Sequence, residues 1–393
     1  MISAAEFIAE ASRRGFDFYT GVPCSFLTPL INGVLNDAAL CYVGAASEGE
    51  AVAIAAGAWL AGRNTIVMCQ NSGLGNAVNP LTSLNAPFRI PTLLITTWRG
   101  QPGIPDEPQH KVMGEITQDL LEVMRIEQAP FPRERGALGP ALARAVEHMA
   151  RSDLPFAFVL EKDSVRDDGL TRAPAERRRP GQREDMMEPG EQPSRAALLE
   201  RFLALVDPAA AIVVTTGKSG RELFTLADRR QHLYQVGSMG GATGMALGIA
   251  LNAPLPVVVL DGDGAALMKL GSMATVGAYR PHNLIHLLLD NGVHDSTGGQ
   301  PTVSAHVDFA GVAQACGYRF ATSCASLAGF EAAFRAAAEA PKPAFIHARI
   351  APGSMGRLGR PTVAPDAVAR RFKAFIAENL IRPAPATAEA TPS

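Results

Sequence analysis

The stretch from Val257 to Gly299 constrains the fold of this chain more than any other. It reads VVVLDGDGAALMKLGSMATVGAYRPHNLIHLLLDNGVHDSTGG. Two apolar runs, residues 257–260 and 284–289, each end in a polar turn that contains glycine, and helical periodicity fills the interval to about Ala278. We therefore predict a strand–helix–strand unit with parallel strands and a right-handed crossover.

Asp263 and Asn291 come just after these two runs. They are predicted to lie at the carboxyl ends of neighbouring parallel strands, where open α/β sheets bind ligands. A carboxylate and an amide oxygen suit Mg²⁺, and the backbone N–H groups of Gly264 and Ala265 would face a diphosphate. Two glycine turns beside an ordinary sheet are the alternative, which Gly-Asp-Gly alone would favour; the second turn at Asn291 favours the metal site.

Composition narrows the classes of protein. Hydrophobic residues make up 47% and charged residues 19%, as in a well-packed globular chain, and the net charge of −2 gives no electrostatic case for nucleic acid or a membrane surface. The five cysteines are scattered without a Cys-x-x-Cys pattern, which is typical of reduced thiols. Residues 1–15 read as an amphipathic helix and not as a signal peptide. We expect a soluble, cytoplasmic protein.

The chain divides into two α/β halves. We predict domains at 1–163 and 195–382, a charged linker rich in proline and glycine at 164–194, and a disordered tail at 383–393. The apolar runs predicted as strands are residues 17–19, 40–43, 65–69, 91–96, 156–160, 211–215, 233–236, 257–260, 284–289 and 344–348. In both halves a helix of small residues follows the second strand, at 49–62 and 240–251, which indicates two similar domains.

The loops after these strands carry the candidate functional residues. Ser25 lies in the loop after the first strand, and Glu48 starts the first small-residue helix, where the helix dipole alone would favour a glutamate. The loop at 70–76 could hold a phosphate, and the long polar loop at 98–111 is of a kind that often serves function, although a plain surface excursion is the alternative. The loop at 237–241 reads on composition as a close contact between helix and sheet.

Nucleotide-binding motifs do not fit. Val78 and Leu267 stand where a dinucleotide fingerprint needs its third glycine, and Ile212 stands where a P-loop before Lys218 needs its first. Lys218 and Arg221 remain candidates for an anion site or a solvated helix start.

The stretch from Gly262 to Asn291 resembles the cofactor motif of thiamine-diphosphate enzymes, which begins Gly-Asp-Gly and ends in asparagine about thirty residues later. The resemblance implies Mg²⁺ ligands at Asp263, Asn291 and the carbonyl of Val293. The motif usually ends Asn-Asn, whereas this chain has Asp290-Asn291, so either residue could be the ligand; we select Asn291.

The chain as a whole resembles the phosphonopyruvate decarboxylases, the two-domain branch that lacks the central third domain of longer relatives. The phrases that carry this resemblance are QNSGLGNAVNPLTSL, WRGQPGIPDEPQH, TTGKSGREL, GSMG and DNGVHDSTGGQPT. It implies two doubly wound parallel-sheet domains, thiamine diphosphate and Mg²⁺ as cofactors, and a small 2-oxo acid carrying a phosphonate as substrate. Decarboxylation to phosphonoacetaldehyde and CO₂, through an ylid and an enamine of the cofactor, would serve phosphonate biosynthesis.

The same resemblance implies residue roles. Glu48 would bind N1′ of the aminopyrimidine, Met239 would bend the cofactor, and Gly237 would accept a hydrogen bond through its carbonyl. Because each site would form between subunits, a homo-oligomer is expected. Further contacts to the cofactor are expected from Ser72, Thr216, Gly217, Gly262, Gly264 and Ala265. Substrate contacts are expected from Ser25, Asn71, Arg99, His110 and His294, with His110 also moving a proton.

Four alternatives stay open or are disfavoured. Sulfopyruvate decarboxylase would use the same mechanism on a sulfonate. A non-catalytic regulatory subunit could keep this fold, but it would have no chemical need for Glu48, Asp263 and Asn291 together. A carboligase is disfavoured by the missing middle domain, and a nicotinamide oxidoreductase by the failed fingerprints.

Overall fold

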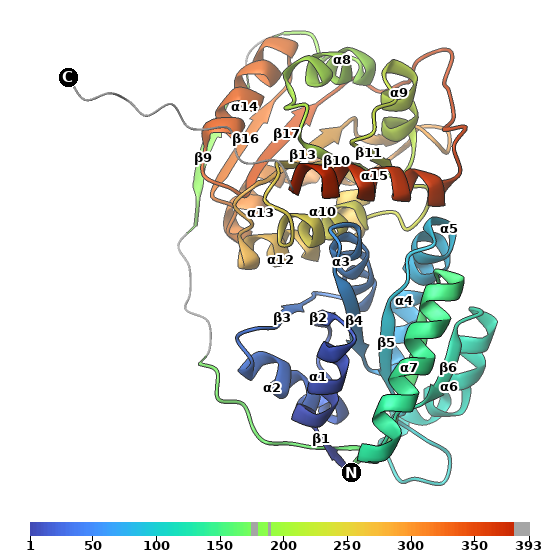
Figure 1. Cartoon of the computed structure of the whole chain (residues 1–393). Helices are drawn as coiled ribbons and strands as arrows, with labels where there is room; N and C mark the ends of the chain where they lie inside the picture. The colour runs from blue at the N-terminus through green and yellow to red at the C-terminus, as the bar shows by residue number, and fades with distance from the viewer. Residues whose placement is uncertain (174–179, 188–189, 381–393) are drawn as a thin grey trace.

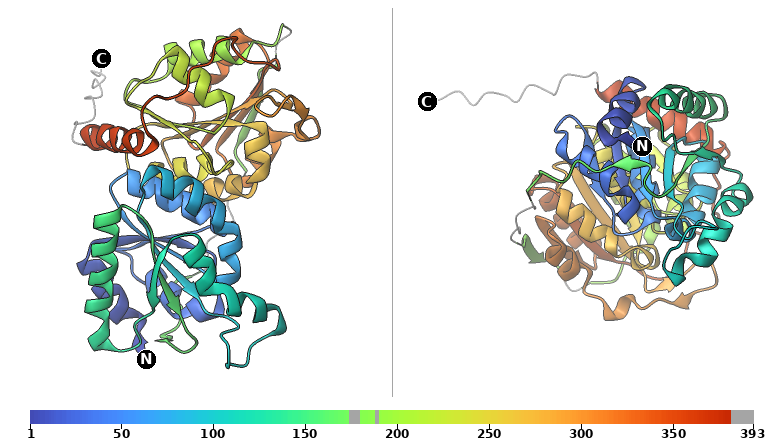
Figure 2. Two further views of the ribbon diagram at one scale, coloured as in Figure 1. Left: turned by 90° about the vertical axis from the view of Figure 1, so that its right-hand side faces the viewer. Right: turned by 90° about the horizontal axis from the view of Figure 1, so that it is seen from below.

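The protein consists of two α/β lobes stacked on one another. The computed structural model describes residues 1–173, 180–187 and 190–380. Figure 1 shows the N-terminus at the far end of the first lobe and helix α15 (Pro365–Leu380) along the junction. The side view in Figure 2 shows α15 at the same level, where the two lobes meet.

The first lobe is built on a six-stranded parallel sheet. Its spatial order is β3 (Cys41–Gly44), β2 (Phe16–Gly21), β4 (Asn64–Cys69), β5 (Leu93–Thr97), β7 (Phe156–Leu160), β6 (Glu127–Pro130). The helices around this sheet are α1 (Ala4–Arg13), α2 (Thr28–Asn36), α3 (Glu48–Leu60), α4 (Leu74–Pro80), α5 (Ala86–Phe88), α6 (Lys111–Val123) and α7 (Arg135–Ser152).

The second lobe is built on a seven-stranded parallel sheet. Its order is β11 (His232–Tyr234), β10 (Ala211–Val214), β12 (Val257–Gly262), β13 (Leu284–Asp290), β17 (Ala344–Arg349), β16 (Phe320–Cys324), β9 (Gln182–Asp185). Its helices are α8 (Arg195–Leu205), α9 (Lys218–Leu226), α10 (Ala242–Ala250), α11 (Asp263–Met268), α12 (Gly271–Tyr279), α13 (Phe309–Cys316), α14 (Leu327–Glu339) and α15. A short antiparallel pair, β14 (Val293–His294) with β15 (Gln300–Pro301), follows β13.

Both sheets share one strand order. If β2–β7 and β10–β17 are each numbered along the chain, leaving out the short antiparallel pair, both sheets read 2-1-3-4-6-5. The chain reverses direction across the sheet between the first and third strands, and α/β proteins bind ligands at this switch point. The prediction of two doubly wound parallel sheets is therefore confirmed, and all ten predicted strands are present. Strands β6 and β16 were not predicted.

The strand–helix–strand unit predicted at the outset is present, with one difference. Strands β12 and β13 pair in parallel from Val257 opposite Leu284 to Gly262 opposite Leu289. The crossover, however, is two helices and not one. The backbone leaves helical geometry at Lys269 (φ −135°, ψ 44°), and the Lys269 side chain packs on the glycine at position 240.

The segment predicted as a linker at 164–194 also differs from expectation. Its β8 (Val165–Arg166) pairs with β1 (Ile2–Ser3), and its β9 extends the second sheet beside β16. All four residues of β9 are exposed and polar, so this edge strand is held by backbone pairing. Its sequence has no apolar pattern from which a strand could be predicted. The predicted tail at 383–393 lies outside the described residues.

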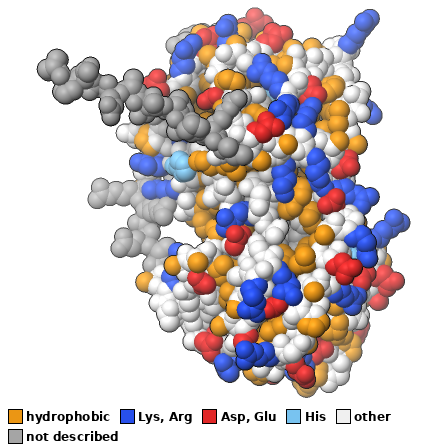
Figure 3. Space-filling view, viewed as in Figure 1, with side chains coloured by type: hydrophobic (Ala, Val, Ile, Leu, Met, Phe, Trp, Pro, Cys, Tyr) orange, Lys and Arg blue, Asp and Glu red, His pale blue; other side chains and the backbone are white. Residues whose placement is uncertain are grey.

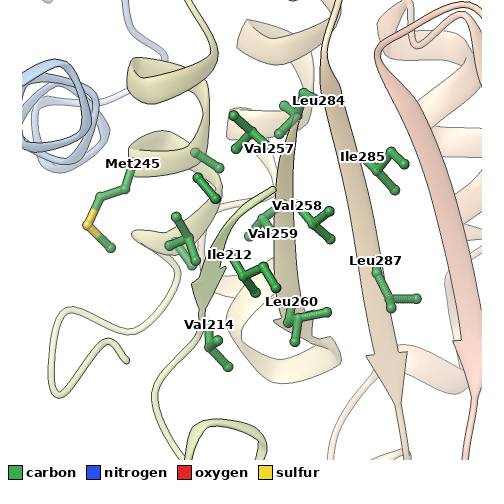
Figure 4. Packing of buried hydrophobic residues seen from close by; sticks show 14 of the residues in the cluster. Ile212, Val214, Met245, Val257, Val258, Val259, Leu260, Leu284, Ile285 and Leu287 are labelled. Carbon is green, nitrogen blue, oxygen red and sulfur yellow. The ribbon is translucent and has the colours of Figure 1, made fainter. Parts of the chain in front are cut away.

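Apolar side chains fill both faces of the second sheet. Figure 4 shows residues of β10, β12 and β13 packed with Met245 of α10. Strands covered on both faces need apolar residues at every position, which explains the unbroken runs in the sequence. On the outer face shown in Figure 3, charged side chains of both signs are interspersed over both lobes. None of the described helices combines the length and apolar character needed to cross a membrane.

The two lobes join through α3 and α10. Every residue of α3 after Glu48 is buried, and so is all of α10. A Cβ at Gly57 would lie 2.0 Å from the carbonyl oxygen of Met245, and one at Gly248 would lie 2.1 Å from that of Ile54. The helices thus touch backbone to backbone, and one apolar core runs through the junction.

Gly57→Ala should lower the melting temperature of the protein by several degrees. The added methyl would overlap the Met245 carbonyl, and overpacking of this kind costs about 1–3 kcal/mol. Gly136→Ala in α7 is the matched control, because a Cβ there meets nothing within 4 Å. Calorimetry of both variants checks this, and equal melting temperatures would contradict the tight contact.

Candidate active site

A cavity lies at the switch point of the second sheet. Its walls are residues 215–219 after β10, residues 262–265 after β12, and Asn291 with residues 293–296 after β13. Arg195, Met239 and Leu289 complete the lining. All of these residues belong to the second lobe. The predicted cofactor and metal residues Asp263, Asn291 and Val293 are thereby brought together.

Asp263 begins α11 and points its carboxylate into a nearly dry environment. The residue is 4% exposed, and its Oδ2 accepts a hydrogen bond from Thr302 Oγ1 at 2.6 Å. Burial raises the pKa of Asp263, and the Asp290 carboxylate acts in the same direction, against the Thr302 hydrogen bond. A divalent cation beside Asp263 would offset this burial, so the donor set fits a hard metal ion.

Asp290 and Asn291 have different surroundings. Asp290 Oδ2 is bonded to His347 Nε2 at 2.8 Å, and its Oδ1 accepts from Ser304 Oγ at 2.8 Å and from the Gly292 N–H at 3.0 Å. Burial raises the pKa of Asp290, but the His347 and Ser304 hydrogen bonds outweigh it and leave the pKa below its usual value. Both oxygens of Asp290 are thus used inside the domain, whereas Asn291 lines the cavity.

The orientation of the Asn291 amide is set by Asp295, a residue that sequence reasoning missed. Asn291 Nδ2 donates to Asp295 Oδ2 at 2.7 Å, which leaves the Asn291 oxygen to accept from the Val293 N–H at 3.3 Å. Arg195 Nη2 donates to the same Asp295 oxygen at 2.6 Å, and its Nη1 lies 3.1 Å from Glu222 Oε1. Glu222, Arg195 and Asp295 thus form a chain of charged side chains that ends at Asn291, the predicted metal ligand.

The amino end of α11 is covered by two of the predicted residues. A Cβ at Gly264 would lie 2.6 Å from the His294 ring and 3.2 Å from Met239 Cε, so a side chain at position 264 would displace the His294 ring. Met239 follows Ser238, whose φ of 51° is left-handed and strained for a residue with a side chain. The Ser238 N–H donates to Ser83 Oγ of the first lobe at 2.8 Å, which helps to hold this conformation.

The predicted substrate residues of the first lobe also form one cluster, at the switch point of their own sheet. Arg99 Nη1 donates to Ser25 Oγ at 3.0 Å, and Asn71 Nδ2 donates to the Arg99 carbonyl at 2.8 Å. His110 is 7% exposed and packs its carbonyl against Gly100. His294, by contrast, lies at the second-lobe cavity.

Two members of this cluster are engaged within the lobe. Arg99 forms an ion pair with Asp106 in which Nε lies 2.7 Å from Oδ2, and the Arg99 guanidinium holds the pKa of Asp106 well below its usual range. Asn71 is fully buried and donates to Thr117 as well as to Arg99. In this structure Arg99 and Asn71 therefore shape the 98–111 loop.

Glu48 stands at the start of α3 with Ser47 as its N-cap. Its Oε2 accepts from Asn76 Nδ2 at 2.8 Å, and its side chain lies against Gly73. Glu50 is buried instead, and burial raises its pKa. Of the two acids, Glu48 is thus the one that can reach a ligand. Gln70 Nε2 donates to Ser72 Oγ at 2.6 Å in the adjoining loop.

The described residues contain no group of three or more His, Cys, Asp or Glu side chains arranged to hold a metal ion. The second-lobe cavity offers a different donor set, one carboxylate and one amide with backbone carbonyls. Such a set leaves positions for phosphate oxygens and water, as Mg²⁺ prefers.

Two family models match the chain. The model described as thiamine pyrophosphate enzyme, N-terminal TPP binding domain, matches residues 2–123, and the corresponding C-terminal TPP binding domain matches residues 215–348. The chain therefore belongs to the thiamine pyrophosphate enzymes, and its cofactor is thiamine diphosphate, which is the same compound. The predicted family, fold and cofactor are confirmed.

Full-length relatives narrow the family. The chain is 52% identical to phosphonopyruvate decarboxylase of Streptomyces viridochromogenes over 379 residues, which is 96% of this chain and 95% of that protein. Within its class it thus belongs to the phosphonopyruvate decarboxylase family. It is 27% identical to sulfopyruvate decarboxylase of Methanosarcina acetivorans over 95% of this chain and 97% of that protein.

Solved structures agree on the fold. Benzoylformate decarboxylase from Polynucleobacter necessarius superposes with a TM-score of 0.68, at 13% identity, over 90% of this chain and all of that one.

Asp295→Ala should weaken Mg²⁺ binding about 10- to 100-fold in the presence of thiamine diphosphate, because the Asn291 amide loses the partner that orients it. Titration calorimetry measures this directly. Asp168→Ala, which removes an exposed carboxylate paired with Arg166, is the control and should bind Mg²⁺ normally. An Asp295→Ala protein with unchanged Mg²⁺ affinity would show that the amide does not depend on Asp295.

Proposed function

We propose that this chain decarboxylates 3-phosphonopyruvate to phosphonoacetaldehyde and CO₂, with thiamine diphosphate and Mg²⁺, in phosphonate biosynthesis. The observation that carries the proposal is the full-length likeness to a phosphonopyruvate decarboxylase, joined to a cavity at the second switch point that has the donors a Mg²⁺–diphosphate needs.

The second lobe would hold the diphosphate and the metal. Asp263 and Asn291 are the side-chain ligands of the proposal and Val293 supplies its carbonyl. Asn291 is preferred to Asp290 because both Asp290 oxygens are already engaged. The backbone N–H groups of Gly264 and Ala265, with Gly262, Thr216 and Gly217 nearby, would face the diphosphate.

When bound, thiamine diphosphate supplies a nucleophilic carbon that adds to the substrate ketone and accepts the electron pair released with CO₂. The protein would assist through Glu48, which exchanges a proton at ring atom N1′, and through the Gly237 carbonyl, which accepts from the ring amino group. Met239 and Ser72 would contact the cofactor. The accessible carboxylate of Glu48, beside the buried Glu50, supports this role.

A second copy of the chain would complete each site. The second-lobe cavity is lined by second-lobe residues alone, which supports a contact to the pyrimidine end of the cofactor from the first lobe of another copy. We accordingly propose a homo-oligomer with sites between subunits, located in the cytoplasm. The five cysteines are all unpaired, which suits a reducing compartment.

Substrate contacts are proposed from Ser25, Arg99 and His110 of the first lobe and from His294 of the second. His110 would hold or deliver a proton through its imidazole ring. Asn71 would act indirectly, by fixing the backbone at Arg99.

The main alternative substrate is sulfopyruvate, since the sulfopyruvate decarboxylases are full-length relatives too. A regulatory subunit without activity is the alternative from another class. The presence of Glu48, Asp263 and Asn291 in suitable places speaks for catalysis.

Incubation with thiamine diphosphate, Mg²⁺ and one of three acids tests the function. We expect the kcat/KM for aldehyde formation from phosphonopyruvate to be roughly tenfold or more above that for sulfopyruvate. The kcat/KM for pyruvate should be lower again. Each step removes negative charge from the substrate and so weakens a charge-assisted contact. A preference for sulfopyruvate would make that the substrate. No turnover of any acid, with cofactor bound, would favour the regulatory subunit.

Glu48→Ala should retain Mg²⁺ and cofactor binding but lose turnover by roughly 10²- to 10⁴-fold, the usual effect of removing a proton-transfer group. The control is Glu107→Ala, which removes an exposed glutamate from the 98–111 loop. Asp106→Ala would not serve as a control, because it would remove the ion-pair partner of Arg99. Steady-state kinetics and cofactor titration separate the outcomes. Near-normal turnover in Glu48→Ala would remove the residue from the mechanism.

A further inference from the structure

A second hollow of about 430 Å³ lies beside the second-lobe cavity, where we propose that the cofactor binds. Its walls come from α9, from the end of β11, from the start of α15, and from Arg360, Pro361 and Val363. These last three belong to residues 351–364, which we call the C-terminal strap. Thr216 and Gly217 line both the hollow and the cofactor cavity, so the two are neighbours. In Figure 1 the strap is the red-orange loop that passes α9 and leads into α15.

The walls of the hollow carry two arginines and no acid. Arg221 and Arg360 line it, and none of its lining residues is Asp or Glu. Arg221 donates to the carbonyls of Gly359 at 3.2 Å and Leu358 at 3.5 Å, which are neutral acceptors and leave its charge uncompensated. Arg360 is exposed and, within the part of the chain that the structure describes, forms no ion pair or side-chain hydrogen bond.

Other arginines near the functional residues are already paired. Arg99 is neutralised by Asp106, and Arg195 by Glu222 and Asp295. An incoming anion would have to displace a carboxylate to reach either of them. Arg360 needs no such exchange, because pairing it costs only the hydration of the arginine and of the anion.

The strap is held at several points along its length. The Gly353 N–H lies 3.1 Å from Asp295 Oδ1, and the Met355 N–H lies 3.2 Å from Glu222 Oε1. Further along, the Gly359 N–H donates to Thr225 Oγ1 at 2.8 Å. Asp295 and Glu222, which accept the first two of these bonds, also belong to the chain of charged side chains that ends at Asn291. The strap that carries Arg360 is therefore attached to the same network as the proposed metal ligand.

We propose that the hollow receives the phosphonate group of the substrate and that Arg360 is the cation that recognises it, with Arg221 holding the strap in place. The proposal rests on the proposed function. A phosphonate carries more negative charge near neutral pH than a sulfonate, and the planar guanidinium can bind two of its oxygens at once. Arg360 therefore acts as the residue that separates phosphonopyruvate from its less charged analogues.

Arg360→Gln tests the proposal in the full-length protein with thiamine diphosphate and Mg²⁺ bound. KM for phosphonopyruvate should rise roughly 10- to 100-fold, the loss expected for one charge-assisted contact. KM for pyruvate and the affinities for cofactor and Mg²⁺ should not change, and the effect on sulfopyruvate should be smaller. Arg360→Lys, which keeps the charge but loses the planar fork, should fall between.

Arg357→Gln is the matched control, because Arg357 is an exposed strap residue that does not line the hollow. Its kinetics should equal those of the unmodified protein. If Arg360→Gln behaves like Arg357→Gln, or if it weakens cofactor binding instead of substrate binding, the proposal is wrong.

A direct binding measurement separates this proposal from the proposed function. Methylphosphonate should bind the cofactor-loaded protein in calorimetry and should bind the Arg360→Gln variant at least about tenfold more weakly. Should the unmodified protein fail to decarboxylate phosphonopyruvate yet show this difference, the function would fall while the anion site stands. Equal binding of methylphosphonate to both proteins would overturn the anion site.

Discussion

The contact between α3 and α10 determines how the rest of the structure is arranged. At Gly57 and Gly248 the backbone of one helix occupies the space where a Cβ on the other would stand. Glu48 is the first residue of α3, and the loop at 237–241 leads into α10. The packing that joins the lobes therefore also positions two elements that we propose to contact the cofactor. Lys269 strengthens this link, since it lies over Gly240 and donates to Ser47 Oγ at 3.4 Å.

The repeated strand order explains why the candidate residues gather in two places. In each sheet the loops after the first and third strands diverge at the switch point and leave a crevice. In the second lobe these loops carry Thr216 and Asp263, and in the first lobe they carry Ser25 and Asn71. The same topology thus gives two switch points with different side chains. An acid and an amide that suit a metal ion lie at the one in the second lobe, and an arginine and a histidine lie near the one in the first lobe.

The sequence predicts the parts of this structure that depend on local pattern. Buried parallel strands leave unbroken apolar runs, so the sheets could be predicted. Asp263 and Asn291 follow two such runs directly, so their position at one edge of the sheet could be predicted as well. Strand β9 could not, because its polar residues pair only through the backbone. The contact between Asp295 and Arg195 joins residues 100 positions apart, so it cannot be predicted from local spacing in the sequence. The position of the strap could not be predicted either, because its contacts to Asp295, Glu222 and Thr225 also join distant parts of the sequence.

Pairing decides what each arginine can do. Arg195 sits between two carboxylates in a buried network, where its charge fixes geometry and has little left for a ligand. Arg99, a proposed substrate contact, is paired with Asp106, and this ion pair also holds the 98–111 loop. Arg221 is held by carbonyls and positions the strap. Among the residues that the structure describes, no carboxylate pairs with Arg360, so its charge remains for an incoming anion.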